Sequence, residues 1–345
     1  MSPAGTADPP DAARTGDPAA PAAWLAAQRQ IVEAATHAPS VHNSQPWRFS
    51  CDDDGLHLYA DEGRRLTVLD PYGRQLHLSC GAALLHAQVA ARALGLDAAT
   101  ELLPDADDPS RLATLRLTTG SEPSSHEQAL ADAIPLRHTY RDAFDEQPLP
   151  EELLTRLRLA AEAQGARLRA LTDPDDVVEL SVLLSWADGI EEADPAYRQE
   201  LASWVHTEPG QDGIPVTALP DDPERGSSLR LRDFGLSGPR PGGGEPPVAE
   251  RPDVVVIVSD DDSPRSWLQA GQALGAVLLE AAHDGVMAQP LAQVTDFAAV
   301  RLRLRNALSL AGTPQLALRI GYATGVDSTP RRSVDDVLGG PGPRD

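Results

Sequence analysis

The chain has 345 residues and carries 52 acidic against 29 basic side chains, which gives a formal net charge of −23 at pH 7. No basic residue is a lysine, and this excludes mechanisms that need a lysine amine, such as Schiff-base formation or a P-loop. A charge of this sign repels phosphate backbones and anionic lipids. We therefore expect neither a nucleic acid nor a membrane as a partner.

Length and composition predict a globular protein of about two domain-sized units, at roughly 100–200 residues each. Residues 1–21 are rich in Pro, Ala and Asp and have neither a basic nor an apolar signal region, so we expect a disordered leader. No apolar stretch is long enough to span a bilayer. Two cysteines are too few for a disulfide framework, and we expect a reduced, cytoplasmic protein.

The first third of the chain shows alternating helix and strand patterns. Apolar spacing predicts a helix over 22–38 that ends before Pro39, because proline does not fit a helix interior. Two short strand candidates, WRFS and LHLYA, flank an acidic turn. Residues 74–96 are apolar on nearly all sides, which indicates a buried central helix, and 112–118 alternate like a strand.

The rest of the chain repeats this succession around a long interruption. Between Trp204 and Arg251 the sequence is rich in Gly, Pro and Asp, and loops of this length are usually lids, binding loops or disordered segments. The other expected elements are a short helix within 123–145, a helix and strand over 150–170, an amphipathic helical stretch over 173–204, a buried strand over 254–259, helices over 264–284 and 295–309, and the strand LALRIGYA.

Two glycines with the same spacing mark each central helix and indicate an internal repeat. In both halves a strand containing Leu-Arg-aliphatic follows the helix. The matching spacing and order favour duplication of one α+β unit, with halves at 22–122 and 123–340 in a fused pseudo-dimer. The two copies read Gly81-x-Ala83-Leu84-x10-Gly95 and Gly271-x-Ala273-Leu274-x10-Gly285.

The segment between the first helix and the first strand combines two prolines with small hydrogen-bonding side chains. Ser40, Asn43 and Gln45 can offer donors and acceptors to a planar heterocycle, while the prolines restrict the loop. The alternative is a helix C-terminal turn in which Asn and Ser cap local backbone groups. The residues alone leave both interpretations open.

This loop, Ala-Pro-Ser-x-x-Asn-x-Gln-Pro-Trp-x-Phe, closely resembles the FMN-binding loop of the nitroreductase family of flavoproteins. Two further phrases resemble the same family, and together the resemblance covers roughly residues 22–340. These phrases are Arg137-His138-Thr139-Tyr140-Arg141-Asp142-Ala143-Phe144, followed by LPEELL, and Arg319-Ile320-Gly321-Tyr322-Ala323 with Thr329-Pro330-Arg331-Arg332-Ser333-Val334.

The order of the phrases resembles that of the Acg-type branch, whose chains are fused copies. In ordinary nitroreductases the arginine phrase precedes the Pro-Ser loop, whereas here it follows by roughly a hundred residues. Each copy has thus kept a different half of the site. The resemblance implies a nitroreductase-like α+β fold of two fused copies, an intrachain pseudo-dimer with one FMN site and a lid formed by the insertion at 205–250.

The resemblance also implies roles for individual residues. Arg137, with Arg331 or Arg332, would bind the FMN phosphate, and Arg141 would lie near flavin N1 and O2. The alternative is that Arg137 and Arg141 form surface ion pairs with the abundant acidic residues and that Arg331 and Arg332 are a basic C-terminal strand edge that binds no ligand. Beyond the flavin itself we assign no catalytic group. The expected cofactor-binding residues are Pro39, Ser40, Val41, Asn43, Gln45, Arg137, His138, Thr139, Arg141, Gln289, Pro290, Leu291, Arg331 and Arg332.

The remaining candidate motifs point to no other chemistry. The histidines lack the spacing of a metal site, so we expect no metal. His42 lies in the Pro-Ser loop and could face a substrate, but a lone loop histidine is usually solvated, and we expect it to be so here. Cys80 lies on the buried helix and is expected to be an inert small side chain.

The favoured function is an FMN oxidoreductase that takes hydride from NADH or NADPH and passes it to a small electron-poor acceptor, such as a nitro compound or quinone. Two alternatives stay open. One is a flavin-sequestering protein whose lid denies nicotinamide access, and the other is a flavin-dependent tailoring dehydrogenase. We expect a monomer, which already contains both copies, or a weak homodimer.

Overall fold

The computed structural model describes most of the chain in nine segments. Residues 1–19 of the leader expected at 1–21 and much of the insertion at 205–250 lie outside the described residues, and residues 20 and 21 already belong to the first helix. The described residues are 20–52, 55–208, 210–219, 229, 232, 234, 252–323, 325 and 328–339.

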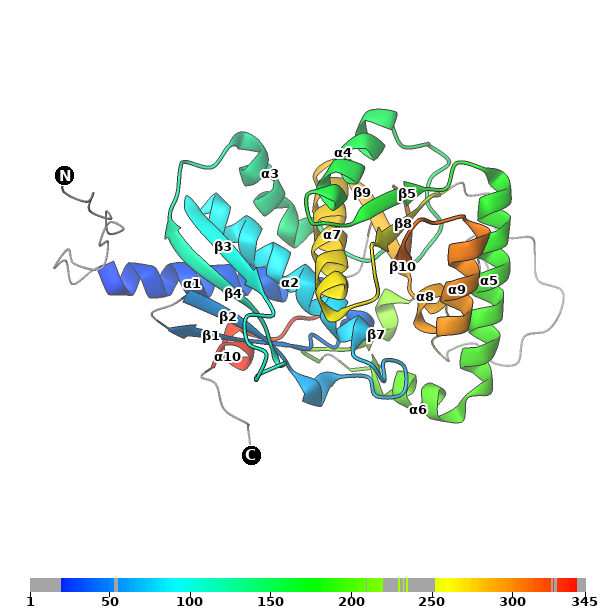
Figure 1. Cartoon of the computed structure of the whole chain (residues 1–345), viewed down its shortest axis with the longest axis horizontal. Helices are drawn as coiled ribbons and strands as arrows, with labels where there is room; N and C mark the ends of the chain where they lie inside the picture. The colour runs from blue at the N-terminus through cyan, green and yellow to red at the C-terminus, as the bar shows by residue number, and fades with distance from the viewer. Residues whose placement is uncertain are drawn as a thin grey trace, which may run out of the picture.

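The first half is an antiparallel sheet covered by helices. Strands β1 (Trp47–Asp52), β2 (Gly55–Ala60), β3 (Leu96–Leu102) and β4 (Arg111–Thr119) pair in the order β1-β2-β4-β3. Helix α2 (Arg74–Ala93) packs on this sheet, and α1 (Ala20–Thr36) packs beside α2 (Figure 1). The core between them contains Trp47, Phe49, Leu58 and Leu84, all with no exposed surface.

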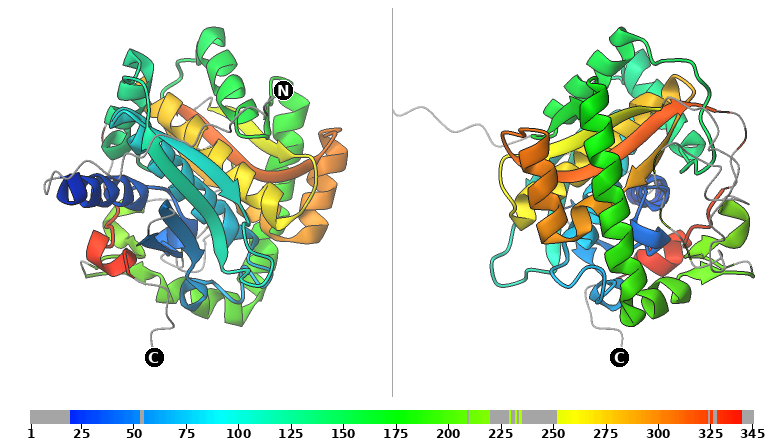
Figure 2. Two further views of the ribbon diagram at one scale, coloured as in Figure 1. Left: turned by 60° about the vertical axis from the view of Figure 1, so that its left-hand side comes forward. Right: turned by 90° about the vertical axis from the view of Figure 1, so that its right-hand side faces the viewer.

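The second half is a similar sheet that is covered on both faces. Strands β5 (Arg167–Ala170), β8 (Asp253–Ser259), β9 (Val286–Leu291) and β10 (Thr313–Tyr322) pair in the order β5-β8-β10-β9. Helices α4 (Glu151–Glu162) and α7 (Pro264–His283) cover one face, whereas α5 (Pro174–Ala193), α8 (Gln293–Asp296) and α9 (Ala298–Ala307) cover the other (Figure 2). Burial on both faces explains why β8 reads as one continuous apolar run.

Helices α2 and α7 meet between the two sheets, so the layers run sheet, helix, helix, sheet (Figure 1). A Cβ on Gly81 would lie 2.1 Å from the Leu268 carbonyl oxygen, and a Cβ on Gly271 would lie 2.1 Å from the Leu78 carbonyl oxygen. The same offset of 190 residues relates the glycines and the leucines, so the contact is reciprocal. Only glycine permits this close approach of the helices.

One further contact between these helices is not reciprocal. Leu85 and Gly275 differ by the same offset of 190 residues and face each other, and a Cβ on Gly275 would lie 2.9 Å from a methyl of Leu85. The helices end alike, because Gly95 and Gly285 have φ angles of 73° and 72°. Such left-handed glycines are common at helix C-termini.

The structure differs from the predicted elements at several points. The helical stretch expected over 173–204 is two helices, α5 and α6 (Pro195–Ser203), because Pro195 opens a new helix that Asp194 caps. The helix expected over 295–309 divides into α8 and α9. Strands β3 and β9 were not predicted.

The other elements are α3 (Ser125–Ala133), α10 (Val334–Val337), the two-residue strands β6 (Val205–His206) and β7 (Ile214–Pro215), and four 3-10 turns at Val41–Asn43, Glu62–Arg64, Ile134–Leu136 and Val216–Ala218.

Within the described ranges, no helix has the length and apolar character needed to cross a bilayer. Cys51 and Cys80 are both free thiols, and Cys80 is fully buried as expected.

Candidate functional site

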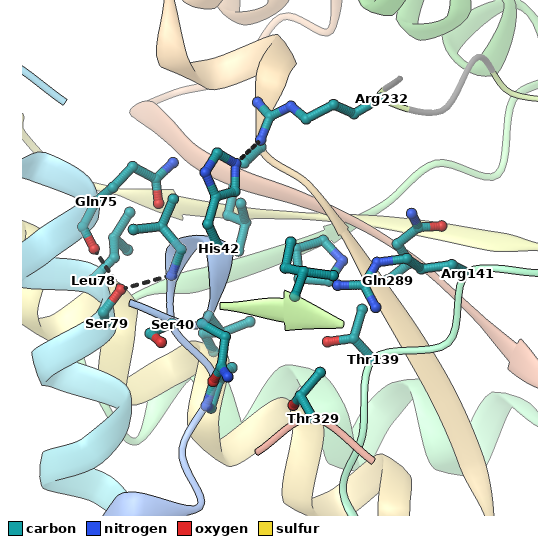
Figure 3. Close-up of a pocket in the computed structure, with 18 of the residues that line it drawn as sticks. Ser40, His42, Gln75, Leu78, Ser79, Thr139, Arg141, Arg232, Gln289 and Thr329 are labelled. Atoms are coloured by element: carbon teal, nitrogen blue, oxygen red, sulfur yellow. Dashed lines mark hydrogen bonds between the residues drawn. The ribbon is translucent and has the colours of Figure 1, made fainter. Parts of the chain in front are cut away.

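A cavity lies where the Pro-Ser loop and α2 of the first half meet the second half. Gln75 and Ser79 project into it from α2, and Thr139 and Arg141 lie on the opposite side (Figure 3). The fold thus brings together two phrases that lie roughly a hundred residues apart in the chain. The predicted residues that line the cavity are Pro39, Ser40, Val41, Asn43, Arg137, Thr139, Arg141, Gln289, Pro290 and Arg331.

The Pro-Ser loop has a strained backbone that local hydrogen bonds hold in place. His42, Asn43 and Gln45 have φ angles of 47°, 54° and 48°, a left-handed region that costs roughly 1–3 kcal/mol per non-glycine residue. Ser40 Oγ accepts a hydrogen bond from Gln45 N at 3.0 Å, and Val41 N donates to Ser79 Oγ at 3.2 Å. The loop therefore caps its own backbone and also lines the cavity, so the two interpretations of its sequence combine.

Asn43 and Gln45 tie this loop to distant parts of the chain. The Asn43 amide donates to the carbonyl oxygens of Gly213 at 2.9 Å and Pro330 at 3.0 Å. Gln45 Oε1 accepts from Arg332 N at 2.8 Å, and the Arg332 guanidinium donates to the Gln45 carbonyl at 3.2 Å. Gln45 and Arg332 hold the loop against the C-terminal segment and do not line the cavity.

The arginine phrase runs beside β9 and is fixed from behind by Arg319, whose side chain is fully buried. Tyr140 N donates to the Ala288 carbonyl at 3.0 Å. Arg319 donates to Gln289 Oε1 at 2.6 Å and to the carbonyl oxygens of Arg141 and Asp142, both at 2.8 Å. These bonds hold Arg141 and Gln289 in one arrangement at the cavity.

Three arginines at the cavity have no carboxylate ion pair among the described residues. Burial and the neighbouring Arg331 lower the pKa of Arg137 from 12.5 to about 9. Burial also lowers the pKa of Arg141 and of Arg331 to about 10. The Nε atoms of Arg137 and Arg331 are buried and lack partners. Because unpaired buried cations are costly, the arrangement favours an anionic ligand such as phosphate.

The described part of the insertion also reaches the cavity, through Ile214, Arg232 and Phe234. Arg141 donates to the Ala218 carbonyl at 3.1 Å, and its guanidinium carbon lies 5.7 Å from the centroid of the Phe234 ring. Residues of the insertion and a residue predicted to bind a cofactor are therefore in direct contact.

Arg232 is the centre of a buried ion network at this end of the cavity. It donates to Glu191 Oε1 at 2.7 Å, to Asp296 Oδ2 at 2.9 Å and to His42 Nε2 at 3.0 Å. Arg74 in turn donates to Asp296 Oδ1 at 2.9 Å. The expectation that His42 is solvated was wrong, since Arg232 and the strained loop bury it to 7% exposure.

Similarity to known proteins identifies the family. No family model matches the chain. A Mycobacterium tuberculosis H37Rv protein with the provisional name NAD(P)H nitroreductase acg is 32% identical over 317 residues, covering 90% of this chain and 94% of the relative. The chain belongs to the nitroreductase family, in its Acg-like branch. A second protein of that strain, also provisionally named an NAD(P)H nitroreductase, is 31% identical over 320 residues and covers 90% of each chain.

The chain also resembles solved nitroreductase structures at low identity. An FMN-bound nitroreductase from Desulfitobacterium hafniense DCB-2 is 13% identical with a TM-score of 0.39, covering 62% of this chain and 98% of that one. One with bound FMN from Bacteroides fragilis is 15% identical with a TM-score of 0.36, covering 58% and 93%.

Not every residue predicted for this Acg-like site lies at the cavity. Besides Gln45 and Arg332, His138 and Leu291 are absent from its lining. Leu291 is buried in the core of the second half, where it belongs to the apolar cluster formed by β8, α5 and α9. His138 is half-buried, and its Nδ1 has no partner.

Several lining residues of the Acg-like site were missed by sequence reasoning. Gln75 and Ser79 gave one usable signal, since two polar residues four apart on an otherwise apolar helix face the same way. Thr329 lies in the C-terminal phrase but received no role. The missed residues are His42, Gln75, Leu78, Ser79, Ile214, Arg232, Phe234, Leu274, Ala292, Gln293, Leu316 and Thr329.

Among the side chains that the structure describes, no three of His, Cys, Asp or Glu lie close enough together to hold a metal ion. The donor set at the cavity instead consists of guanidinium, amide and hydroxyl groups beside apolar walls formed by Leu78, Leu274, Pro290 and Leu316. This set fits a planar ring system that carries a phosphate, as FMN does.

Proposed function

We propose that the chain binds one FMN in this cavity and is an FMN-dependent oxidoreductase. It takes hydride from NADH or NADPH and delivers it to a small electron-poor acceptor such as a nitro compound or quinone. The observation that carries the proposal is a group of three arginines without carboxylate partners among the described residues, of which Arg137 is buried and Arg141 and Arg331 are partly buried. The names of the Acg-like relatives and the FMN in nitroreductase structures support it.

The residues divide into a phosphate end and a ring end. Arg137 and Arg331 would bind the phosphate, with hydroxyl groups from Thr139 and Thr329 beside them. Pro39 and Pro290 would contact the ring system. FMN supplies the hydride chemistry when bound, and the protein orients the ring and keeps water away from it. Arg141 would place a positive charge near N1 and O2, which favours the reduced flavin.

The fused pseudo-dimer belongs to this proposal. It is supported by the equal strand order of the two sheets and by the reciprocal contact of Gly81 and Gly271. The Pro-Ser loop comes from the half at 22–122 and the arginine phrase from the half at 123–340. One chain therefore holds one complete site, and a monomer suffices. We expect one FMN per chain, measured as flavin absorbance against protein mass. Two per chain would contradict the loss of one half-site from each copy.

A second candidate function is flavin sequestration under the insertion, which would act as a lid. Ile214, Arg232 and Phe234 line the cavity, and Ala218 accepts a hydrogen bond from Arg141. Side chains in these places would deny a nicotinamide ring access to the flavin face. This candidate shares the FMN site with the first and differs only in turnover.

Anaerobic mixing of the FMN-loaded protein with NADH and with NADPH tests the proposal. Bleaching of the flavin absorbance band by either cofactor, followed by recovery on addition of menadione, is the expected result. If dithionite bleaches the band but neither nicotinamide does, the sequestration candidate is favoured. Protein that neither carries FMN nor binds added FMN would refute both.

A further inference from the structure

Two residues that line the cavity each carry a buried hydrogen-bond donor without a partner among the described residues, and the first is His42. Its Nε2 lies 3.0 Å from an Arg232 nitrogen. A guanidinium group can only donate, so Nε2 must accept, and the neutral imidazole then carries its proton on Nδ1. Burial and the charges of Arg232 and Arg141 keep the pKa of His42 well below its usual range, in agreement with a neutral ring. Nδ1 is buried and has no partner.

The second donor is the side-chain amide of Gln293, at the start of α8. The residue is 2% exposed, lines the cavity and has no partner for Nε2. Arg232 links the two donors in space, because it donates to His42 and also binds Asp296, three residues further along α8. Leaving a buried donor without an acceptor costs roughly 1–3 kcal/mol. Two such donors at one cavity end point to a ligand that accepts hydrogen bonds.

The charges around these donors determine what kind of acceptor fits. Two arginines, Arg74 and Arg232, pair with two carboxylates, Asp296 and Glu191, so the network has no net charge. Asp296 also accepts from the Gln75 amide at 2.5 Å. With its carboxylates already engaged, this network itself contributes little net attraction for a cation or for a second anion. A neutral oxygen, such as a carbonyl or nitro oxygen, fits best.

We infer that His42 Nδ1 and Gln293 Nε2 form a subsite for a neutral hydrogen-bond-accepting oxygen. The inference rests on the proposed FMN site, and that oxygen has two sources. It is either a carbonyl of the isoalloxazine ring or the oxygen of the electron acceptor bound above it. In both cases the two donors act on a different part of the ligand from the phosphate-binding arginines.

Gln293→Met tests the subsite, because methionine keeps the length of the side chain and removes the donor. Gln293→Glu is isosteric and replaces the amide donor with an acceptor when ionised. Gln272→Leu is the matched control, since Gln272 is also buried but donates to Gln88 at 3.1 Å, outside the cavity lining. Thermal unfolding identifies any variant that fails to fold.

Two measurements distinguish the sources of the oxygen. The first is the Kd of FMN for the deflavinated protein, from flavin fluorescence. The second is the menadione concentration that gives half the maximal rate of anaerobic reoxidation after dithionite reduction. Loss of one hydrogen bond in Gln293→Met should raise either the Kd of FMN or the half-maximal menadione concentration by roughly 2- to 12-fold, and Gln293→Glu should raise the same quantity further. A change in Kd indicates the flavin carbonyl, and a change in the menadione constant indicates the acceptor.

The outcomes separate this inference from the proposed function. If the wild type binds FMN but both Gln293 variants match Gln272→Leu within twofold in both measurements, the inference is overturned and the FMN site stands. If the wild type binds no FMN, the proposed function fails and the inference fails with it.

Discussion

Replacing Arg137 by methionine should make the FMN-free protein more stable while weakening FMN binding. Arg137 is 4% exposed, and its Nη2 donates a hydrogen bond to the His37 carbonyl at 2.9 Å. Arg331 repels it, and no described carboxylate pairs with it. Most buried residues show the opposite behaviour, because removing them destabilises the protein.

The fall in the pKa of Arg137 sets the scale of the effect. A change from 12.5 to about 9 corresponds to about 5 kcal/mol at ~1.36 kcal/mol per pH unit. Water entry into the empty site returns part of this energy. Replacing buried ionic groups by apolar ones stabilises proteins by about 1–4 kcal/mol, and we expect Arg137→Met to fall in that range. Loss of its charged hydrogen bonds to phosphate, at roughly 1.5–3 kcal/mol, should raise the Kd of FMN about 10- to 150-fold.

The sign of the pH dependence gives an independent readout. The folded pKa lies below the unfolded value, so the folded protein releases this proton first. Below about pH 9 the buried positive charge of Arg137 destabilises the folded protein by its full amount. The free energy of unfolding then rises as the pH increases from there towards 12.5. The stability advantage of Arg137→Met over the wild type should therefore shrink by about 1 kcal/mol between pH 8 and pH 10.

Urea unfolding of the deflavinated proteins at pH 8 and pH 10, with FMN titration by fluorescence, measures these effects. Arg319→Met is the matched control. Arg319 is equally buried, but its removal leaves the Gln289 side chain and two carbonyl oxygens without their donor, so stability should fall by at least about 2 kcal/mol. If Arg137→Met loses stability as Arg319→Met does and binds FMN with unchanged Kd, the electrostatic argument is refuted.

Three further predictions address the other parts of the site and fold. Arg141→Ala should lower the midpoint potential of bound FMN by several tens of millivolts in a redox titration. A unit charge at ~4 Å from the reduced ring contributes roughly 4 kcal/mol before water compensates, and ~30 mV corresponds to about 1.4 kcal/mol. An unchanged potential would show that Arg141 does not lie near N1 and O2. Inorganic phosphate should raise the Tm of the deflavinated wild type but have less effect on Arg137→Met, and equal shifts would argue against a phosphate site at Arg137. Gly81→Ala should lower the free energy of unfolding by about 1–3 kcal/mol or more, because the new Cβ would clash with the Leu268 carbonyl. The control is Gly189→Ala, where no atom lies within 4 Å of the new Cβ, and thermal unfolding should show it to be neutral or slightly stabilising.

The sequence revealed those parts of the fold and site whose signal is local. The central helices, strand β8 and the Pro-Ser loop each lie within one short segment. The equal spacing of the glycines in the two central helices indicated that the two halves are related to each other. Strands β3 and β9 were missed because both lie at sheet edges. In β3 residues of intermediate exposure alternate with exposed ones, and β9 contains Pro290, which an edge strand tolerates but which normally argues against a strand.

The missed parts of the site depend on contacts between distant segments. Arg232 and His42 are 190 residues apart, and nothing in the sequence around either residue indicates the other. Arg319 was noticed in the repeat and in the C-terminal phrase but received no role, because its position behind Arg141 and Gln289 appears only when β9 and β10 pair. Gln45 and Arg332 were both predicted to bind the cofactor, but the sequence could not show that they bind one another and are absent from the cavity lining.

The packing of Leu85 against Gly275 has a consequence for how such a chain can evolve. In a symmetric homodimer, two equivalent positions that face each other must carry the same residue, which here would mean leucine against leucine or glycine against glycine. The first pair would be overpacked, and the second would leave a void. One continuous chain encodes the two positions separately, so a large side chain can fill the space beside a small one. An isolated half would therefore form a poorly matched pair with its own copy, and the two halves should prefer each other.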